Sequence, residues 1–194
     1  IIIIIAMIIS SIIAYIYMNM VGLEDTARKI IPMMLLTIGF GAIGFIDDYK
    51  KLVLKNTEGL KPSYKMLGLL IISVSYVIYL IQGLNLGTET YIPILKTYIE
   101  LPTVVYIPAA IVVILATTNA INLTDGIDGL SSSVSAIIIT CLTVIGLMIG
   151  IGEVSVFGSI VIGATLGFLM FNLHPAKVFM GDTGSLLLGG VISG

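Results

Sequence analysis

The 194-residue chain is 58% hydrophobic and 10% charged, with a mean hydropathy of +1.16 and a formal net charge of −2. This composition is typical of an integral membrane protein and excludes an ordinary soluble domain. The lack of net positive charge argues against nucleic-acid binding. The single cysteine, Cys141, excludes an internal disulfide and argues against a thiolate metal site.

Apolar runs of about 20 residues can cross the ~30 Å hydrocarbon core of a bilayer as helices. The sequence predicts an all-α polytopic membrane protein, with residues 1–194 forming one helical bundle in a single domain. We expect six complete transmembrane helices and the start of a seventh near 184, the six being 1–21, 30–46, 66–83, 103–121, 131–150 and 154–172. Because the chain begins and ends inside apolar runs, we expect a piece of a larger protein that lacks segments at both ends.

The loops between these runs alternate between the two sides of the membrane. Six lysines lie in the loops at 47–65, 122–130 and 172–183, whereas the opposite loops hold three basic residues. By the positive-inside rule, the first group of loops is cytoplasmic. On the outer side, TYIPILKTYIEL in the loop 84–102 alternates in part and predicts a short β-hairpin, with Pro93 at an edge.

Five of the six aspartates fall in three short polar patches, each next to a long apolar run. The patches read GFIDDYKKL, NAINLTDGIDGL and NLHPAKVFMGDTGSLLLGG, and all three are predicted to be cytoplasmic. An ionisable residue at membrane depth indicates a functional site. Acids gathered on one face of a chain with few charges favour a cation site over a role in solubility.

The first patch places Asp47 and Asp48 directly after the predicted helix 30–46. An acid at a helix C-terminus is unfavourable by roughly 0.3–1 kcal/mol, so stability alone does not explain two. A bound divalent cation, or Lys50 and Lys51, would reverse the sign. Because adjacent residues do not share a helix face, we expect the two carboxylates to have different roles. The alternative interpretation is a solvated polar boundary.

In the second patch, Asp125 and Asp128 are three residues apart and would share a helix face if a helix starts near Thr124. Two glycines with the same spacing permit close approach of a ligand to the backbone. Thr124 or Asp125 is expected to cap the helix running to 150, whose positive end would favour a phosphate or a carboxylate. A simple capping loop would explain Thr124 and one aspartate, but not Asn119, Asn122 and the second aspartate together.

The third patch contains Asp182 between two glycines that indicate a turn. Thr183 or Ser185 is expected to cap the next helix, so that Asp182 lies beside a helix N-terminus at the membrane edge. A small set of oxygen ligands completed by water or phosphate suits Mg²⁺ better than Zn²⁺. From the residues alone we infer Mg²⁺-dependent phosphoryl-group chemistry, with aspartates holding the metal and lysines neutralising phosphate.

Two other side chains of the third patch are ambiguous in the sequence. Pro175 moves His174 out of helical geometry, and a lone histidine is more often structural than catalytic. Phe179 could stack on a nucleobase or simply pack.

The motifs IDDY, NLTDGIDGL and HPAKVFMGDTGS, in this order, resemble the polyprenyl-phosphate N-acetylhexosamine-1-phosphate transferase superfamily. The tract KNTEGLKPSYK, and His174 before Pro175, favour its phospho-N-acetylmuramoyl-pentapeptide transferase branch. The resemblance implies a ten-helix enzyme of the bacterial cytoplasmic (inner) membrane, with its active site on the cytoplasmic side and a possible homodimeric state. It implies transfer of phospho-MurNAc-pentapeptide from UDP-MurNAc-pentapeptide to undecaprenyl phosphate, giving lipid I and UMP with Mg²⁺ as cofactor, the first membrane step of peptidoglycan synthesis.

The resemblance also implies roles for individual residues. Asp182 resembles the Mg²⁺ ligand, and Asp47 and Asp48 resemble the catalytic pair that acts with it. Residues that resemble the nucleotide and substrate site are Asn122, Asp125, Gly126, Ile127, Asp128, Asn172, His174 and Phe179. Lys51, Lys55 and Lys65 resemble contacts to the diphosphate or the lipid phosphate. The family's first helix, its last helices and a histidine-rich loop are absent, so these expectations concern the larger protein.

Two alternatives stay open at the level of sequence. The nearer is a sister enzyme that uses UDP-GlcNAc. The more remote is a transporter or channel, which would place charges along its helices, whereas the runs 66–83, 131–150 and 154–172 contain no Asp, Glu, Lys or Arg. The sequence is compatible both with direct in-line attack by the lipid phosphate and with a covalent aspartyl intermediate.

Overall fold

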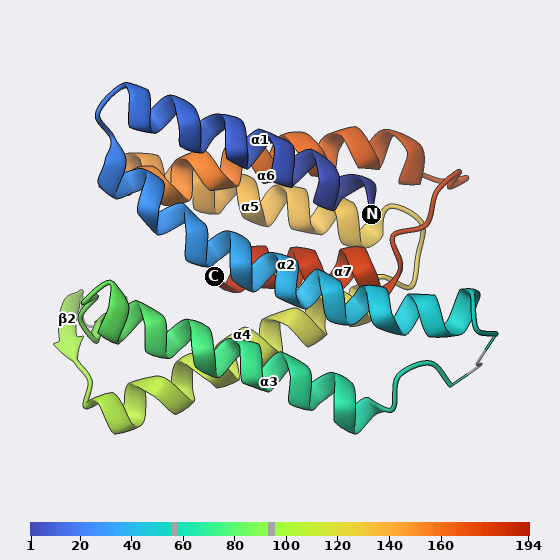
Figure 1. Cartoon of the computed structure of the whole chain (residues 1–194), viewed down its shortest axis with the longest axis horizontal. Helices are drawn as coiled ribbons and strands as arrows, with labels where there is room; N and C mark the ends of the chain where they lie inside the picture. The colour runs from blue at the N-terminus through green and yellow to red at the C-terminus, as the bar shows by residue number, and fades with distance from the viewer. Residues whose placement is uncertain (56–57, 93–95) are drawn as a thin grey trace.

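The computed structural model describes residues 1–55, 58–92 and 96–194. Its helices are α1 (Ile2–Met20), α2 (Glu24–Leu52), α3 (Pro62–Ile78), α4 (Thr103–Thr124), α5 (Leu130–Ile149), α6 (Gly152–Asn172) and α7 (Gly181–Ser193), and a π-helical turn, Tyr79–Gly83, continues α3 (Figure 1). Within the described residues, the six helices α1 to α6 are long and apolar enough to span a membrane. The predicted all-α polytopic membrane fold is therefore confirmed.

The predicted hairpin is also present. Strands β1 (Glu89–Ile92) and β2 (Thr97–Glu100) pair antiparallel, with Tyr91 opposite Tyr98. The two tyrosine rings pack with their centroids 5.1 Å apart, a cross-strand contact that stabilises a short hairpin. Pro93, which the sequence places at its edge, lies outside the described residues.

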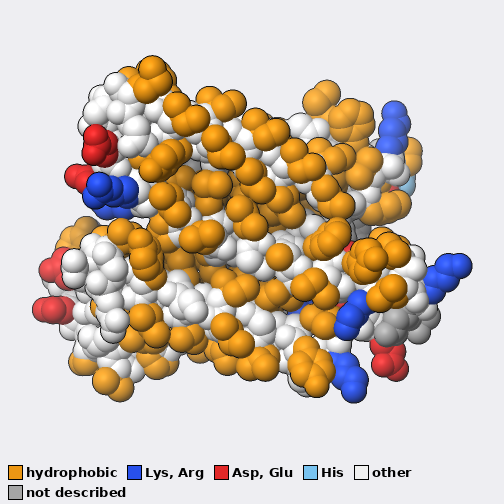
Figure 2. All heavy atoms as spheres, in the orientation of Figure 1, with side chains coloured by type: hydrophobic (Ala, Val, Ile, Leu, Met, Phe, Trp, Pro, Cys, Tyr) orange, Lys and Arg blue, Asp and Glu red, His pale blue; other side chains and the backbone are white. Residues whose placement is uncertain are grey.

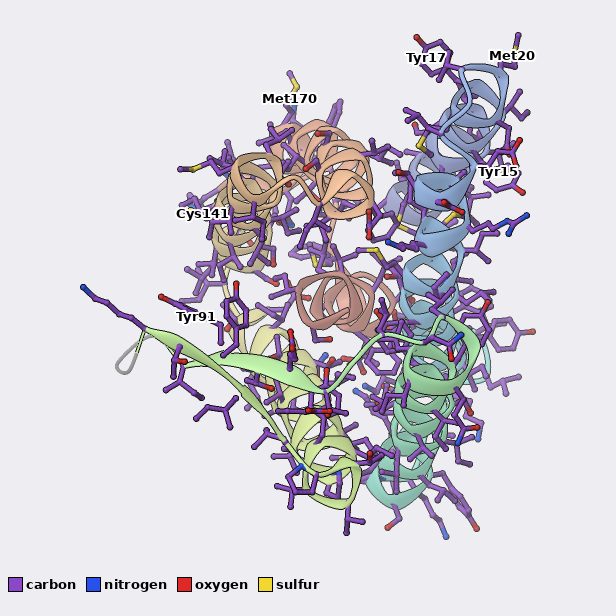
Figure 3. The ribbon with its side chains drawn as sticks, turned by 90° about the vertical axis from the view of Figure 1, so that its left-hand side faces the viewer. Tyr15, Tyr17, Met20, Tyr91, Cys141 and Met170 are labelled. Atoms are coloured by element: carbon purple, nitrogen blue, oxygen red, sulfur yellow. The ribbon has the colours of Figure 1, made fainter. Side chains whose placement is uncertain are left out.

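Helix α7 lies in the middle of the bundle. Its main neighbours are α2 and α4. Helices α1, α5 and α6 lie on one side of α7, and α3 and α4 lie on the other (Figures 1 and 3). Residues 183–191 of this helix are all buried. Small residues make this possible, because a Cβ on Gly189 would lie 2.5 Å from the Cα of Thr118 in α4. The shortest of the seven described helices thus forms the centre of the packing.

The outside of the bundle is apolar between two polar ends. Figure 2 shows hydrophobic side chains over the middle of the molecule, with acidic and basic side chains gathered at both ends. In the end-on view of Figure 3, Tyr15, Tyr17 and Met20 of α1, Cys141 of α5 and Met170 of α6 point away from the bundle. An apolar surface of this kind is the one a bilayer solvates.

The loops that carry the three aspartate patches meet at one end of the bundle. The α2–α3, α4–α5 and α6–α7 connections all lie at the right-hand end in Figure 1, whereas the hairpin lies at the opposite end. This arrangement follows from six consecutive helices that alternate in direction, because every second connection then returns to the same end.

Helix α2 is longer than the sequence predicted. It extends from Glu24 to Leu52, so Asp47 and Asp48 lie inside its C-terminal turns and do not follow it. The prediction ended the helix where the apolar run ends. The helix continues because Lys51 pairs with Asp47 at the i, i+4 spacing, which stabilises a polar helical turn.

The predicted helix start near Thr124 is wrong. Helix α4 ends at Thr124 and α5 begins at Leu130, so Asp125 and Asp128 lie in a connecting turn and share no helix face. The Thr124 hydroxyl donates to the carbonyl of Ala120, 2.8 Å away, and therefore caps nothing in α5. The turn enters α5 through a glycine at position 129 with φ of 73°, a conformation that few other residues adopt. The remaining predicted runs each fall on one helix.

Candidate functional site

Three carboxylates meet at the end of the bundle. Asp47 and Asp48 come from the last turns of α2, and Asp182 comes from the first turn of α7. One oxygen from each lies within 4.8 Å of the others, and Asp47 is only 2% exposed. A set of carboxylate oxygens at this spacing fits a hard divalent cation such as Mg²⁺, which keeps part of its water shell. The residues present therefore fit the metal that the sequence predicted.

Two lysines neutralise part of this acidic cluster. The Lys51 Nζ lies 2.5 Å from Asp47 Oδ2 and 3.0 Å from Asp182 Oδ2. Lys65, in the first turn of α3, places its Nζ 3.2 Å from the same Asp182 oxygen. Two ammonium groups beside three carboxylates leave one negative charge, which favours a further cation. Lys55 is exposed, with φ of 51°, and belongs to none of these ion pairs in the described part of the chain.

Asp182 is bound by side chains from α2, α3 and α4, namely Lys51, Lys65 and Asn122. The Asn122 side-chain amide, near the end of α4, donates to its Oδ1 at 2.8 Å and to the Ser185 hydroxyl at 2.8 Å. Burial by itself would raise the pKa of the Asp182 carboxyl. The hydrogen bonds that it accepts from Asn122 and Lys51, with the positive charge of Lys65, outweigh burial and lower that pKa below its ordinary value. The lowered pKa favours the ionised form of Asp182, which is the form that binds a cation.

Asp48 holds the N-terminus of α7 from outside that helix. Its Oδ1 accepts the backbone N–H of Asp182 at 3.1 Å, and its Oδ2 accepts the backbone N–H and the hydroxyl of Thr183 at 2.8 and 2.5 Å. The first N–H groups of a helix have no partner within it, and the positive end of its dipole favours a carboxylate. The sequence predicted Thr183 or Ser185 as the cap. Both lie inside α7, and the cap comes from α2.

Asp47 contacts different neighbours. Its Oδ1 accepts the backbone N–H of Leu60 at 2.5 Å, which ties the connection between α2 and α3 to the end of α2. Its Oδ2 bonds to the ammonium group of Lys51. The two adjacent aspartates therefore bind different neighbours, although one oxygen of each lies within 4.8 Å of the other.

A cavity of about 230 Å³ lies beside the cluster. It gathers side chains and backbone from the α4–α5 turn, the end of α6 and the start of α7, and its lining residues are Asp125, Gly126, Ile127, Asp128, Asn172, Phe179, Met180 and Gly181. Six of the predicted nucleotide-site residues thus line one cavity, although they come from two patches far apart in sequence. Gly181 joins its wall directly to Asp182.

Asn172 lines this cavity with its polar atoms already engaged. Its Oδ1 accepts the hydroxyl of Ser132 at 2.6 Å, and its Nδ2 donates to the carbonyl of Val178 at 2.9 Å. The side chain is buried and holds the α6–α7 connection against α5. The structure therefore gives Asn172 a part in shaping the cavity wall.

Asp128 joins the two loops that form the cavity. Its Oδ2 accepts the backbone N–H of Ala176 at 3.1 Å and lies 3.2 Å from Nδ1 of His174. The His174 side chain is 85% exposed and is not among the residues that line the cavity, so only its contact with Asp128 connects it to this site. Phe179 lines the cavity and is 75% exposed, so much of its ring is accessible to a ligand.

Asp125 lies in the cavity with a perturbed acidity. Burial, and then the negative charges of Asp182 and Asp48, raise the pKa of its carboxyl to about 6. The residue follows the last turn of α4, outside the spanning helices. A carboxyl group with this pKa can both donate and accept hydrogen bonds near neutral pH.

Sequence reasoning missed three contributors to the site. Thr183 was expected as a helix cap and is a partner of Asp48. Ser185 was expected in the same role and is a partner of Asn122. Gly44, the last of the three glycines in GFGAIGF, allows α2 to approach the start of α7, because a Cβ there would lie 2.2 Å from the carbonyl oxygen of Asp182. Glycines spaced along an apolar helix are the signal that could have indicated such an approach.

Comparison with known proteins places these residues in a family. The model of glycosyl transferase family 4 matches residues 30–194, a stretch that contains all three patches. The chain belongs to this family. The match agrees with the superfamily resemblance predicted from the three motifs.

Individual relatives carry a more specific name. The phospho-N-acetylmuramoyl-pentapeptide-transferase of Halalkalibacterium halodurans is 44% identical over 167 residues, which are 86% of this chain and 51% of the relative. The protein of the same name from Clostridium botulinum strain Alaska E43 is 44% identical over 176 residues, which are 91% of this chain and 53% of the relative. The chain thus spans about half the length of these curated relatives. The similarity confirms the resemblance to this branch of the superfamily.

Proposed function

We propose that the protein transfers phospho-MurNAc-pentapeptide from UDP-MurNAc-pentapeptide to undecaprenyl phosphate, forming lipid I and UMP at the cytoplasmic face of the bacterial inner membrane. The observation that carries this proposal is the cluster of Asp47, Asp48 and Asp182 with its two lysines, next to a cavity at the polar end of a membrane bundle. The names of the relatives support the choice of substrates.

The carboxylates of Asp47 and Asp182 would hold Mg²⁺. One oxygen of each is paired with the ammonium group of Lys51, which a metal ion could displace. The ion would neutralise the diphosphate of the donor as charge moves onto the leaving UMP. Lys51 and Lys65 lie at the same oxygens and would contact the diphosphate. Lys55 has no such position in the described residues, and its predicted phosphate contact stays a proposal that rests on the resemblance.

The acceptor phosphate needs little activation. The second pKa of a phosphate monoester is about 6, so the acceptor is largely dianionic at neutral pH. One of its oxygens forms a bond to the sugar-linked phosphorus of the donor, and the bond from that phosphorus to the bridging oxygen breaks, releasing UMP. We favour this direct in-line route, in which Asp47 positions the acceptor. The alternative route passes through a covalent aspartyl intermediate. On that route, incubation with radiolabelled UDP-sugar and no lipid would leave label on the enzyme, and repeated absence of label on active protein would eliminate the covalent route.

The cavity beside the cluster would hold the uridine of the donor. The exposed ring of Phe179 is placed to stack on the base, and base–aromatic stacking is worth about 1–3 kcal/mol in nucleic-acid complexes. Asp125, Asp128 and the exposed His174 offer hydrogen-bond partners for the base and the ribose. Asn122 and Asn172 would act indirectly, by fixing Asp182 and the cavity wall.

The test is UMP release by the protein in detergent with undecaprenyl phosphate and Mg²⁺, comparing UDP-MurNAc-pentapeptide with UDP-GlcNAc. The expected result is release only with the pentapeptide donor, abolished by EDTA and by Asp182→Asn. Release only with UDP-GlcNAc would assign the protein to the sister enzymes. A folded protein that releases UMP from neither donor would overturn the proposal.

A further inference from the structure

The bonds of Asp48 separate its role from that of Asp47. Both of its oxygens are engaged by α7, one by the N–H of Asp182 and the other by the N–H and hydroxyl of Thr183. We propose that Asp48 is a positioning residue, which caps α7 and thereby fixes the carboxylate of Asp182, and that it is neither the base nor the nucleophile of the reaction. This inference rests on the proposed function for its catalytic consequence.

Two glycines make this cap possible. Gly181 has φ of 67°, and a Cβ there would lie 2.8 Å from Asp48 Oδ2. Gly44 lies one turn before Asp48, against the backbone of Asp182. A Cβ at position 44 would collide with that backbone. The Asp48 carboxylate can therefore approach the N-terminus of α7 because both helices have a glycine at the point of contact. Asp48 is half-buried, so its bonds to α7 are partly shielded from solvent.

Asp47 differs from Asp48 in that a lysine side chain binds one of its oxygens. The Oδ2 of Asp47 faces the ammonium group of Lys51, which is 41% exposed and flexible, so a cation or a phosphate can displace it. Asp48 is less free to exchange its partners, because releasing its oxygens would leave the first N–H groups of α7 without a hydrogen-bond acceptor. Of the two adjacent carboxylates, the geometry leaves Asp47 for direct contact with metal or substrate.

Amide hydrogen exchange in the intact protein tests the cap without any need for turnover. In Asp48→Ala, we expect the amides of residues 182 and 183 to exchange at least about tenfold faster, since one lost bond of about 1.4 kcal/mol already gives that factor. Asp48→Asn keeps one acceptor and should be intermediate. Asp47→Asn is the matched control, and it should leave these amides unchanged while loosening that of Leu60. Equal protection at 182 and 183 in all three variants would overturn the proposal.

Thr183 offers a milder variant in case the changes at Asp48 impair folding. Thr183→Val removes only the hydroxyl bond to Asp48, and it should speed exchange at 183 about two- to fivefold, whereas Thr183→Ser should restore protection. If Thr183→Val exchanges as the parent protein does, the cap is not held as proposed.

Metal affinity and pH dependence distinguish positioning from base catalysis. With Mn²⁺ as probe and no substrate present, Asp48→Asn should bind the metal about tenfold more weakly, because Asp182 is no longer fixed. Its residual UMP release should follow the same pH profile as the parent protein. Loss of the acidic limb of that profile, with metal affinity intact, would make Asp48 a base and overturn the inference. Failure of the proposed function would appear separately, as absence of UMP release by the parent protein.

Discussion

Gly44 of α2 lies directly against the backbone of Asp182. A Cβ at position 44 would lie 2.2 Å from the carbonyl oxygen of Asp182 and 2.5 Å from its carbonyl carbon. Neither atom belongs to a flexible side chain that could move aside. The position of the Asp182 carboxylate, which we propose as a metal ligand, thus depends on the absence of a side chain one turn before the aspartate pair.

We expect Gly44→Ala to displace the start of α7 and to reduce UMP release at least tenfold. Overpacking against a backbone typically costs about 1–3 kcal/mol of stability, so the melting temperature should also fall. Gly163→Ala in α6 is the matched control, because a Cβ there meets nothing within 4 Å. That variant should be active and, as alanine favours helix, at least as stable. Full activity of Gly44→Ala would contradict the described packing.

Lys51 occupies the oxygens that we assign to the metal, so its removal should have opposite effects on two ligands. In Lys51→Gln without donor, Mn²⁺ should bind about fivefold more tightly, since a competing ion pair of roughly 1 kcal/mol is lost. The KM for the donor should instead rise about tenfold, because the diphosphate loses a counter-charge. Lys50→Gln is the control, since Lys50 takes no part in these ion pairs among the described residues. Weaker binding of both ligands would show that Lys51 does not compete with the metal.

Asp125 should make stability depend on pH in a defined direction. Its pKa is raised to about 6, so protonation favours the folded state, and this stabilisation is complete below the ordinary value of 3.8. It is lost as the pH rises through about 6. For a half-buried group we expect a loss of about 1 kcal/mol after solvent screening. In EDTA, the melting temperature of Asp125→Asn should match that of the parent at pH 4 and exceed it by about 2–4 °C at pH 7. A constant difference across this range would contradict the assignment.

Phe179 should contribute to donor binding with little effect on the chemical step. Phe179→Ala is expected to raise the KM for the UDP-sugar at least fivefold and to leave kcat within about twofold, as for loss of a stacking contact. Phe179→Tyr should restore binding. Phe171→Ala is a suitable control, because Phe171 is exposed on α6 and does not line the cavity. Equal effects of the two alanine variants would show that stacking at position 179 is not involved.

The sequence was sufficient for the features that depend on one segment at a time. Each apolar run could be identified alone, and the alternation of loops then brought Asp47, Asp128 and Asp182 to one end of the bundle. The bonds between segments could not be predicted, because Asp48 and Thr183 are 135 residues apart and no local pattern connects them. The predicted end of α2 was wrong for a related reason. Lys51 stabilises the last turns of this helix by an ion pair with Asp47, and hydropathy alone does not detect such a pair. Asn172 was predicted from resemblance alone, and its bonds with Ser132 and Val178 became visible only in the fold.

The complete burial of residues 183–191 limits what substitutions α7 can tolerate. On a helix with a lipid-facing side, one aliphatic residue can replace another, because the acyl chains adapt to its shape. Every position in this part of α7 instead has protein on all sides, so volume decides, and even a methyl group is too large at Gly189. Among functional sequences, we therefore expect side-chain volume to vary less in α7 than in the helices that face lipid, although hardly any of the buried residues of α7 would touch a substrate.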